Sequence, residues 1–428
     1  MVLVLIMFAV FLLMGMPVAF AIGISGFIWF LQHPYLPITI PIQVSLSQII
    51  NFTLLAIPMF IVAGNTMNFA GVTGRLLDFA SVLVGHMRGG LGQVSAVLST
   101  LMGGVSGSSI ADAAMETRML GPEMLKRGYP KGFAVAVNVW TSLITPIIPP
   151  GIAFIIYGTI GQVSIGRLFA AGIVPGLLLM VAYMFVIAFV ARRLGLQPER
   201  ERRASPKEVV HALSRSIWAI LFPIFLLFGL RTGIFTPSEV GAFAVVYGML
   251  VGLAIHKEMD WKSFFDAALE GSVGDIGSVM AILGLSAIFS YGMVWDKIPE
   301  KLAVSLLGIT TNPYGLMLII IAFLIFAGLF IDATALILMT TAVLLPVARK
   351  VGIDPVHFGL VFILSAAMGN QTPPVGASMY AGCSVLGASL EEYTKASWPF
   401  LLATIAVIVV VMLFPQLVLF IPNLLFGK

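Results

Sequence analysis

Two carboxyl groups lie in unusual surroundings in this chain. Asp112 and Asp332 each stand inside a long segment of otherwise apolar and small residues. A carboxylate in an apolar, membrane-like environment is costly, and it is a functional-site hypothesis by default. Three roles fit both residues: they could bind a cation, relay a proton, or accept hydrogen bonds from the backbone near the turn of a helical hairpin.

Hydroxyl groups and freed backbone carbonyls accompany both aspartates. The segment Ser106–Ser109 carries three hydroxyls, and two proline-rich segments, 145–151 and 369–376, should interrupt helices. Proline removes a backbone donor, so carbonyl oxygens behind it stay free. Such oxygens suit a hard monovalent cation such as sodium, and inward-pointing helix N-termini suit an anionic group. The alternative is that the breaks are kinks that serve helix packing, because Gly and Pro are common in membrane helices.

Both sets of residues belong to an internal repeat with a shift of about 224 residues. The matched positions are Gly104 with Gly328, Pro122 with Pro346, Lys126 with Lys350, Gly128 with Gly352, and Pro149-Pro150 with Pro373-Pro374. One isolated break would favour the packing explanation, but two matched copies favour a functional one. Membrane proteins with such repeats and broken helices tend to be secondary transporters, which hold substrate and coupling ion near the bilayer midplane.

The composition indicates a membrane protein. Hydrophobic residues make up 59% of the chain and charged residues 10%, and the first charged side chain is Arg75. Soluble domains carry about 25% charged residues, so we predict an all-α polytopic protein in a lipid bilayer. The net charge of +4 does not indicate nucleic-acid binding, and the single cysteine, Cys383, excludes an intrachain disulfide. The N-terminus lacks a basic region and a cleavage site, so we expect it to be retained.

Charged loops orient the chain. The segment 192–215 holds seven Lys/Arg against three Glu, so it is predicted to be cytoplasmic, as is the basic segment 122–131. The segment 92–118 then begins and ends on the cytoplasmic side, which predicts a re-entrant hairpin with its Gly/Ser run as the tip. By the count of spans, the matching hairpin 315–345 opens to the opposite side, so the repeats are expected to be inverted.

Five segments make up the predicted organisation. They are N-terminal scaffold helices (1–50), a first inverted repeat (51–190) with hairpin 92–118 and broken helix 133–160, a cytoplasmic loop (191–215), scaffold helices with an interfacial helix (216–275), and a second inverted repeat (276–428) with hairpin 315–345 and broken helix 356–386. Amphipathic stretches at 71–90 and 296–312 are expected to lie along the membrane surface as arms. The interfacial helix is placed at 257–270.

Other polar residues are given lesser roles. Asn138 and Asn370 lie in apolar surroundings and are expected to line a cavity. Glu116 and Arg118 follow Asp112 by one to two turns and are expected to pair with each other near the cytoplasmic surface. The five histidines lie in loops or at span ends, so no metal site or proton relay is assigned to them.

Two kinds of intramembrane enzyme share fragments of these patterns. Gly104–Gly107 matches the Gly-x-Ser-Gly of rhomboid-type serine proteases, but a serine nucleophile needs a base, and no mid-membrane histidine is apparent. Presenilin-type proteases pair two aspartates but use Gly-x-Gly-Asp, whereas this chain has Leu-Phe-Ile-Asp at 329–332. The chain is therefore not predicted to be an enzyme.

Four separated motifs resemble those of one membrane protein family. They are Met14–Gly23 (MGMPVAFAIG), Ala56–Phe60 (AIPMF), Ser106–Asp112 (SGSSIAD) and Asn370–Gly376 (NQTPPVG). In this order, and over essentially the whole chain, they resemble the large membrane subunit of TRAP transporters, the tripartite ATP-independent periplasmic transporters of bacteria and archaea.

The resemblance implies an elevator-type ion transporter architecture, in which a moving transport domain contains both hairpins. It implies two partners, a small four-helix membrane subunit and a soluble periplasmic substrate-binding protein, and a location in the bacterial inner membrane. It also implies sodium-driven uptake of a carboxylate such as a C4-dicarboxylate or sialic acid, with sodium ions co-transported. Because the chain begins at the large-subunit pattern, the small subunit is expected to be a separate polypeptide.

Candidate site residues follow from the hairpins, the breaks and the resemblance. Cation ligands are assigned to Gly103, Ser106, Thr145, Pro149, Gly328, Gly369 and Thr372. Substrate contacts are assigned to Ser108, Ser109, Asn138, Asn370, Pro149 and Pro373, and a structural or coupling role to Asp112 and Asp332. Since position 103 is a glycine, it could offer only its backbone carbonyl. The alternative function is a stand-alone secondary carboxylate transporter or exchanger that needs no binding protein.

Overall fold

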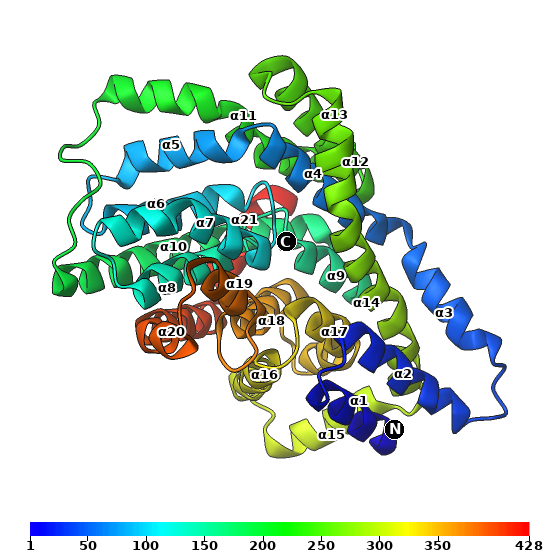
Figure 1. Cartoon of the computed structure of the whole chain (residues 1–428). Coiled ribbons are helices and arrows are strands. Elements are labelled where there is room, and N and C mark those ends of the chain that lie inside the picture. Colours follow the sequence, from blue (N-terminus) through cyan, green and yellow to red (C-terminus); the bar gives the residue numbers. More distant parts are fainter. Residues whose placement is uncertain (428) are drawn as a thin grey trace.

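The structure is a computed structural model that describes residues 1–427. These residues form helices joined by turns, with no strand among them (Figure 1). Seven helices in this part of the chain are long and apolar enough to cross a membrane, and one bent helix pair would make eight. The prediction of an all-α polytopic membrane protein is therefore confirmed.

One group of helices forms a flank of the molecule. It consists of α1 (Val2–Leu13), α2 (Val18–Leu31), α3 (Thr39–Ile49), η1 (Phe52–Leu55), α4 (Ala56–Phe69), α5 (Val72–Val84), α11 (Pro206–Thr232), α12 (Pro237–Met249), η3 (Leu250–His256), α13 (Trp261–Ser263), η4 (Phe264–Leu269), α14 (Glu270–Trp295) and α15 (Ile298–Ile309). α2 packs along α14 and α4 along α12. Glycines allow the close approach: a Cβ added at Gly26 would lie 2.8 Å from the backbone nitrogen of Phe289.

The second group holds both predicted hairpins and both predicted breaks. It consists of α6 (Gly90–Met102), α7 (Ser109–Lys126), α8 (Lys131–Thr141), η2 (Ser142–Ile144), α9 (Ile152–Gly161), α10 (Ile165–Leu194), α16 (Pro313–Gly328), α17 (Ala333–Lys350), α18 (Pro355–Met368), η5 (Gly369–Gln371), α19 (Ala377–Leu386), α20 (Leu390–Leu413) and α21 (Pro415–Phe426). Its core is aromatic, with Trp140, Tyr157 and Tyr183 fully buried.

Several helices of the second group are too short to cross a bilayer alone. α9 and α19 have 10 residues each. At 1.5 Å per residue they are about 15 Å long, half of the hydrocarbon thickness. α8 with η2 and then α9 thus form one helix interrupted at the first proline segment, and α18 with η5 and then α19 form the other.

The helix bounds repeat along the chain. α7 starts at Ser109 and α17 at Ala333, and both helices have 18 residues, so their bounds differ by 224 at each end. α9 and α19 start at 152 and 377, a shift of 225, because one extra residue lies in the second break. The turns that follow α7 and α17 match as well, since Gly128 and Gly352 have positive φ values of 82° and 78°.

The two repeats exchange their short half-helices. α9, from the first repeat, packs against α17 of the second, and α19 packs against α7 of the first (Figure 1). Both contacts use a glycine: a Cβ at Gly161 would lie 2.6 Å from a methyl of Leu345, and one at Gly121 would lie 2.7 Å from a methyl of Leu386. Each hairpin is therefore held by a helix of the other repeat.

The predicted cytoplasmic loop at 191–215 is shorter in the structure. α10 continues to Leu194 and α11 starts at Pro206, so only residues 195–205 lie outside helices. A capping box between Ser205 and Glu208 starts α11. This start signal is visible in the sequence, but the high charge of the segment masked it.

The predicted interfacial helix at 257–270 is not a separate element. From Trp261 to Trp295 the chain forms one continuous helical run of 35 residues, with a π-helical stretch at Phe264–Leu269. The predicted boundary between 275 and 276 falls inside this run. The difference arises because a change in polarity along a continuous helix has the same sequence pattern as the end of a helix.

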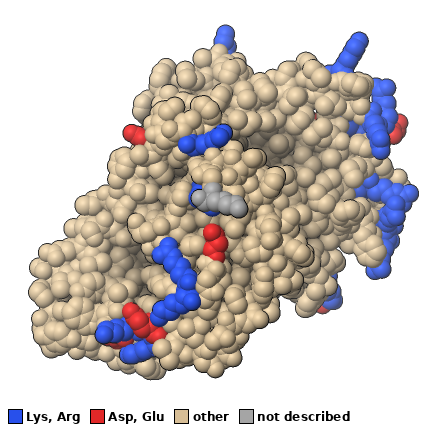
Figure 2. Space-filling model, turned by 180° about the vertical axis from the view of Figure 1, so that it is seen from behind, with Lys and Arg blue, Asp and Glu red and all other residues tan. Residues whose placement is uncertain are grey.

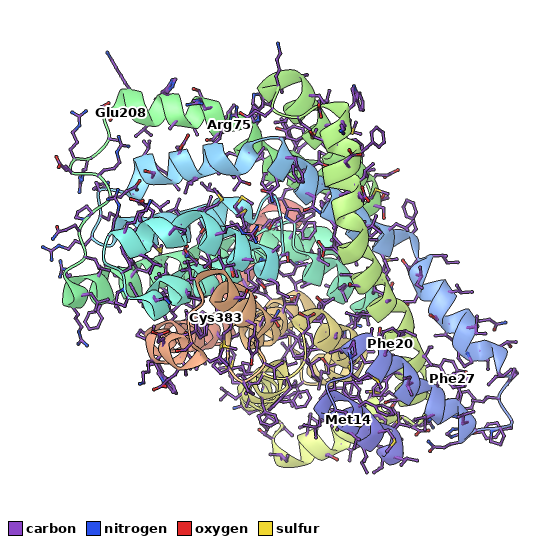
Figure 3. The ribbon with its side chains drawn as sticks, in the orientation of Figure 1. Met14, Phe20, Phe27, Arg75, Glu208 and Cys383 are labelled. Carbon is purple, nitrogen blue, oxygen red and sulfur yellow. The ribbon has the colours of Figure 1, made fainter. Side chains whose placement is uncertain are left out.

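Charged side chains leave much of the surface uncovered. In Figure 2, Lys, Arg, Asp and Glu gather in a few groups, and broad areas between them are free of charge. On α2, Phe20 and Phe27, both labelled in Figure 3, are 59% and 38% exposed. Exposed aromatic residues on an uncharged face are suited to contact with lipid or with another membrane helix.

Candidate functional site

The tip of each hairpin rests on the break of its own repeat. In the first repeat, a Cβ added at Gly103 would lie 2.4 Å from the Cβ of Ile148. Gly107 has a φ of +64°, and a Cβ there would lie 2.7 Å from the carbonyl oxygen of Pro150. Only glycine allows so close a contact at these two positions. At Gly107 the contact brings the backbone of the tip against the backbone of the break.

Three predicted residues meet at this first tip. The Ser106 hydroxyl donates to the Asp112 carboxylate at 2.5 Å. The hydroxyl of Thr145 lies beside the same carboxylate, and it also reaches the carbonyl oxygen of Ser99 at 3.4 Å. Asp112 is buried, and no Lys or Arg pairs with it among the residues described. The site is therefore an enclosed group of oxygen atoms with one carboxyl group.

The second tip and break touch through their backbones. A Cβ added at Gly369 would lie 2.2 Å from the carbonyl carbon and oxygen of Gly328. The Thr372 hydroxyl donates to the carbonyl oxygen of Met368 at 2.7 Å. Backbone carbonyls of the tip and of the break thus come together here, with Thr372 one turn away.

Asp332 has a structural role in this arrangement. It is the N-cap of α17, where one carboxylate oxygen accepts from the backbone N–H of Thr334 at 2.8 Å. Its other oxygen accepts from the Asn370 amide at 3.2 Å, which ties the tip to the break. The N-cap of α7 is Ser108, and 332 − 108 = 224. Asp332 is therefore the counterpart of Ser108 and not of Asp112.

The two repeats meet between the first tip and α19. Ser378 on α19 donates to the Ser109 hydroxyl at 3.3 Å, and both side chains are buried. Pro149 is buried in the first break and Pro373 is half-buried in the second. Ser108, Ser109 and the two breaks are thus close to the contact between the repeats. Ser378 was not identified from the sequence, because serine is unremarkable in an Ala/Gly-rich helix.

Asn138 does not join the other predicted site residues. It is fully buried on α8, and its amide donates to the sulfur of Met124 at 3.7 Å. Met124 lies near the end of α7, 15 residues from Ser109, or about 22 Å along the helix. The structure therefore brings Asn370, but not Asn138, to a hairpin tip.

The predicted pairing of Glu116 with Arg118 is wrong. Arg118 is exposed, whereas Glu116 is fully buried and accepts hydrogen bonds from Ser95 at 2.8 Å and Ser99 at 2.6 Å. The reason is helical geometry: Glu116 lies four residues after Asp112 and shares its inward face. The spacing of Asp112 with Glu116, and of Ser95 with Ser99, was the signal that could have predicted this cluster.

Two hairpins whose tips meet two interrupted helices, inside an all-α membrane protein, define a secondary transporter. The chain matches the family model described as "Tripartite ATP-independent periplasmic transporter, DctM component" over residues 5–417. It therefore belongs to this family, as the resemblance predicted. The family consists of transport permeases and not of enzymes, which confirms that part of the prediction.

Several curated proteins are similar over most of the chain. The large permease protein SiaM of a sialic acid TRAP transporter from Vibrio cholerae is 34% identical over 413 residues, 96% of each chain. The large permease protein DctM of a C4-dicarboxylate TRAP transporter from Pseudomonas aeruginosa is 32% identical over 375 residues, 87% of each chain. The isethionate TRAP transporter permease protein DctMQ from Oleidesulfovibrio alaskensis is 34% identical over 96% of this chain, which spans 65% of that relative's length.

Proposed function

We propose that this chain is the large membrane subunit of a sodium-coupled importer for a small organic acid, with a carboxylate as the recognised group. The observation that carries the proposal is the meeting of each hairpin tip with a helix break of its own repeat. At both places carbonyl or hydroxyl oxygens converge in a buried or half-buried setting. Oxygen ligands of this kind suit a hard monovalent cation.

The substrate site is placed between the two breaks. The N-termini of α7 and α19 lie there, with Ser109 and Ser378 in contact. Helix N-termini and hydroxyl donors favour an anionic group. The printed names of three relatives include carboxylates, namely sialic acid, a C4-dicarboxylate and 2,3-diketo-L-gulonate, and a fourth name includes isethionate, a sulfonate. We therefore infer an organic acid anion for this chain too.

The partners and the movement follow from the family. We infer that a small membrane subunit and a periplasmic substrate-binding protein complete the transporter in the bacterial inner membrane. The first helix group would be the scaffold, and the second, with both hairpins, would move across it as an elevator with its repeats inverted. The small subunit would cover part of the exposed apolar surface of the scaffold.

Sodium binding is tested by thermal unfolding of the detergent-purified protein in NaCl and in KCl at equal ionic strength. A ligand that binds only the folded state stabilises it by RT ln(1 + [L]/Kd), about 2.7 kcal/mol at a hundredfold excess over Kd. We expect sodium to raise the melting temperature and the Thr372→Val change to remove that increase. Thr232→Val is the matched control, because Thr232 makes the same bond to a carbonyl one turn back but is exposed at the end of α11.

Reconstitution into vesicles separates this proposal from a stand-alone carrier. With the small subunit present, uptake of the substrate should require the soluble binding protein. Uptake by this chain alone at the same rate would contradict the tripartite assignment and support a stand-alone transporter or exchanger.

A further inference from the structure

Glu116 is a buried carboxyl group that the proposed sodium sites do not use. It lies on α7, four residues after Asp112, and is fully buried. The elements packed on α7 bring no other charge toward it within the described residues: α6 and η2 have no ionisable side chain, Lys131 is exposed at the start of α8, and α19 carries only Tyr380 and Cys383. Asp112 is the one charged neighbour that faces it.

Three hydroxyl groups surround this carboxyl group. Ser99 contacts one carboxyl oxygen at 2.6 Å, and Ser95 contacts the other at 2.8 Å. The Ser95 oxygen also lies 2.7 Å from the Thr141 hydroxyl oxygen, which in turn lies 2.8 Å from the carbonyl oxygen of Val137. These are the four shortest oxygen–oxygen contacts of the group, and they are joined in one chain. The Thr141 hydroxyl also lies at a longer 3.3 Å from a Glu116 carboxyl oxygen and 3.2 Å from the carbonyl oxygen of Asn138.

The four contacts require four hydrogens, one in each. The three hydroxyls supply three, since a serine or threonine hydroxyl has a single hydrogen and the Val137 carbonyl has none. If Glu116 were ionised, one pair of oxygens at 2.8 Å or less would face each other with no hydrogen between them. A protonated carboxyl group completes the chain: it donates to Ser95, Ser95 donates to Thr141, and Thr141 donates to Val137, while Ser99 donates to the carboxyl group.

We propose that Glu116 is a proton-binding site of this transporter, loaded at neutral pH in this conformation and emptied when a cation binds beside Asp112. The hydrogen count assigns the proton to Glu116. Asp112 is the better place for a negative charge, because it lies in the first turn of α7 and accepts from Ser106. Two carboxyl groups one turn apart, with no basic partner, do not both stay charged in an apolar interior.

The ligand is a proton rather than a sodium ion. The serine oxygens lie within 2.8 Å of the carboxyl oxygens, so they are already in direct contact with them. Calcium binds oxygen at roughly 2.3–2.6 Å, and a cation of similar size seated between these oxygens would have to push them apart. A cation at the Ser106 end of the network would instead act by charge, since it neutralises Asp112 and weakens proton binding at Glu116. This second part rests on the proposed sodium coupling.

The proton is tested by infrared spectroscopy of the folded, detergent-purified protein at pH 7. We expect the carbonyl absorption of a protonated carboxylic acid in the wild type, its loss in Glu116→Gln, and its retention in Glu123→Gln. Glu123 is a matched glutamate on the same helix whose side chain is 44% exposed and paired with Lys126 and Arg127. Asp112→Asn should also retain it. Absence of the band in the folded wild type, or its persistence in Glu116→Gln, would overturn the assignment.

A second variant covers the case in which Glu116→Gln does not fold. Ser95→Ala removes the acceptor of the carboxyl proton but leaves Glu116 in place. The acid band should then shift in position without disappearing. An unshifted band would place the proton on another group and would refute the hydrogen-bond chain.

The link to sodium is tested by proton release. Addition of NaCl to wild-type protein in weak buffer with a pH-indicator dye should release protons, whereas KCl should not, and Glu116→Gln should release none. A melting temperature that rises with sodium but no release of protons would refute the link. If sodium changes neither quantity, sodium coupling itself fails, and the infrared result still decides whether Glu116 holds a proton.

Discussion

The two tip-and-break sites have the same backbone plan but different surroundings. The first is enclosed: its tip is covered by Gly64 of α4 and by Pro223 of α11. The second is partly open, with Phe330 of its tip and Val375 of its break 42% and 49% exposed. In this conformation the first repeat therefore shields its site and the second does not. Two sites with identical roles would be expected to have the same exposure.

The carboxyl groups of the two sites also differ, since Asp332 is held by the backbone and Asp112 is not. Asp332 uses both oxygens to cap α17 and to hold Asn370, so it fixes the backbone. Asp112 caps nothing, and its nearest partners are hydroxyls that can turn to another acceptor. The comparison indicates that the second site is built from carbonyls on a fixed frame, and the first from side chains that can respond to a cation.

The largest expected effect comes from the contact between Gly328 and Gly369. A methyl group at Gly369 would meet the Gly328 backbone at 2.2 Å, so Gly369→Ala must push the tip off the break. We expect destabilisation at the upper end of about 1–3 kcal/mol and loss of the sodium effect on melting temperature. Gly308→Ala on α15 is the control, since nothing lies within 4 Å of its position. Equal melting temperatures for the two variants would contradict this account.

A smaller effect should separate the two aspartates. Asp332→Ala removes an N-cap and should lower the free energy of unfolding by about 1 kcal/mol, whereas Asp332→Asn keeps a capping side chain and should lose less. Asp112→Asn should change stability little in potassium but remove the stabilisation by sodium. Thermal unfolding of the three variants in both salts measures this, and a sodium response that survives in Asp112→Asn would count against a cation beside it.

The contact between the repeats can be tested through its two serines. Ser109→Ala, Ser378→Ala and the double variant form a thermodynamic cycle, which we expect to give a coupling of about 1 kcal/mol, the net value of one buried hydrogen bond. Melting curves provide the free energies. A coupling near zero would mean that the two hydroxyls bond elsewhere and that the repeats meet without them.

The smallest effect concerns the arm α5, which an ion pair ties to the turn between η3 and α13. Arg75, labelled in Figure 3, contacts Glu258 at 2.6 Å, and this partner lowers the pKa of the Glu258 carboxyl from its usual 4.5. The pair therefore contributes stability above pH 4.5, and the contribution disappears as the pH falls through the lowered value. Wild type and Glu258→Gln should differ by less than about 1 kcal/mol near pH 7 and should converge in acid. A gap that widens in acid would exclude this pair as its cause.

Much of the fold could be predicted because the repeat, the glycines and the prolines are local signals. The two Pro-Pro pairs mark where a helix is interrupted, and the shift of about 224 residues relates one interruption to the other. Single prolines do not have this effect here, since Pro122 and Pro346 lie inside α7 and α17. Helix ends inside charged segments were harder, as the run from Trp261 to Trp295 shows. The charge of a segment indicates on which side of the membrane it lies, but it does not indicate whether its backbone is helical.

The site could be predicted only in part, because the type of a single residue does not reveal which other side chains share its face of a helix. Ser106, Thr145 and Asn370 could be singled out because they lie in a hairpin tip or in a proline-rich break. For Glu116, the nearby Arg118 suggests an ion pair at the surface, but the structure shows no such pair. Two residues that follow each other by two positions face different sides of a helix, so the pairing partner of Glu116 had to be sought four positions away.

The exchange of half-helices has a mechanical consequence. α9 leans on α17 and α19 leans on α7, so a force on either hairpin is transmitted to the opposite repeat. Displacing the first hairpin alone would slide α7 along α19, and displacing the second alone would slide α17 along α9. These contacts interlock α7, α9, α17 and α19. A rigid-body movement that preserves both contacts must therefore include both hairpins.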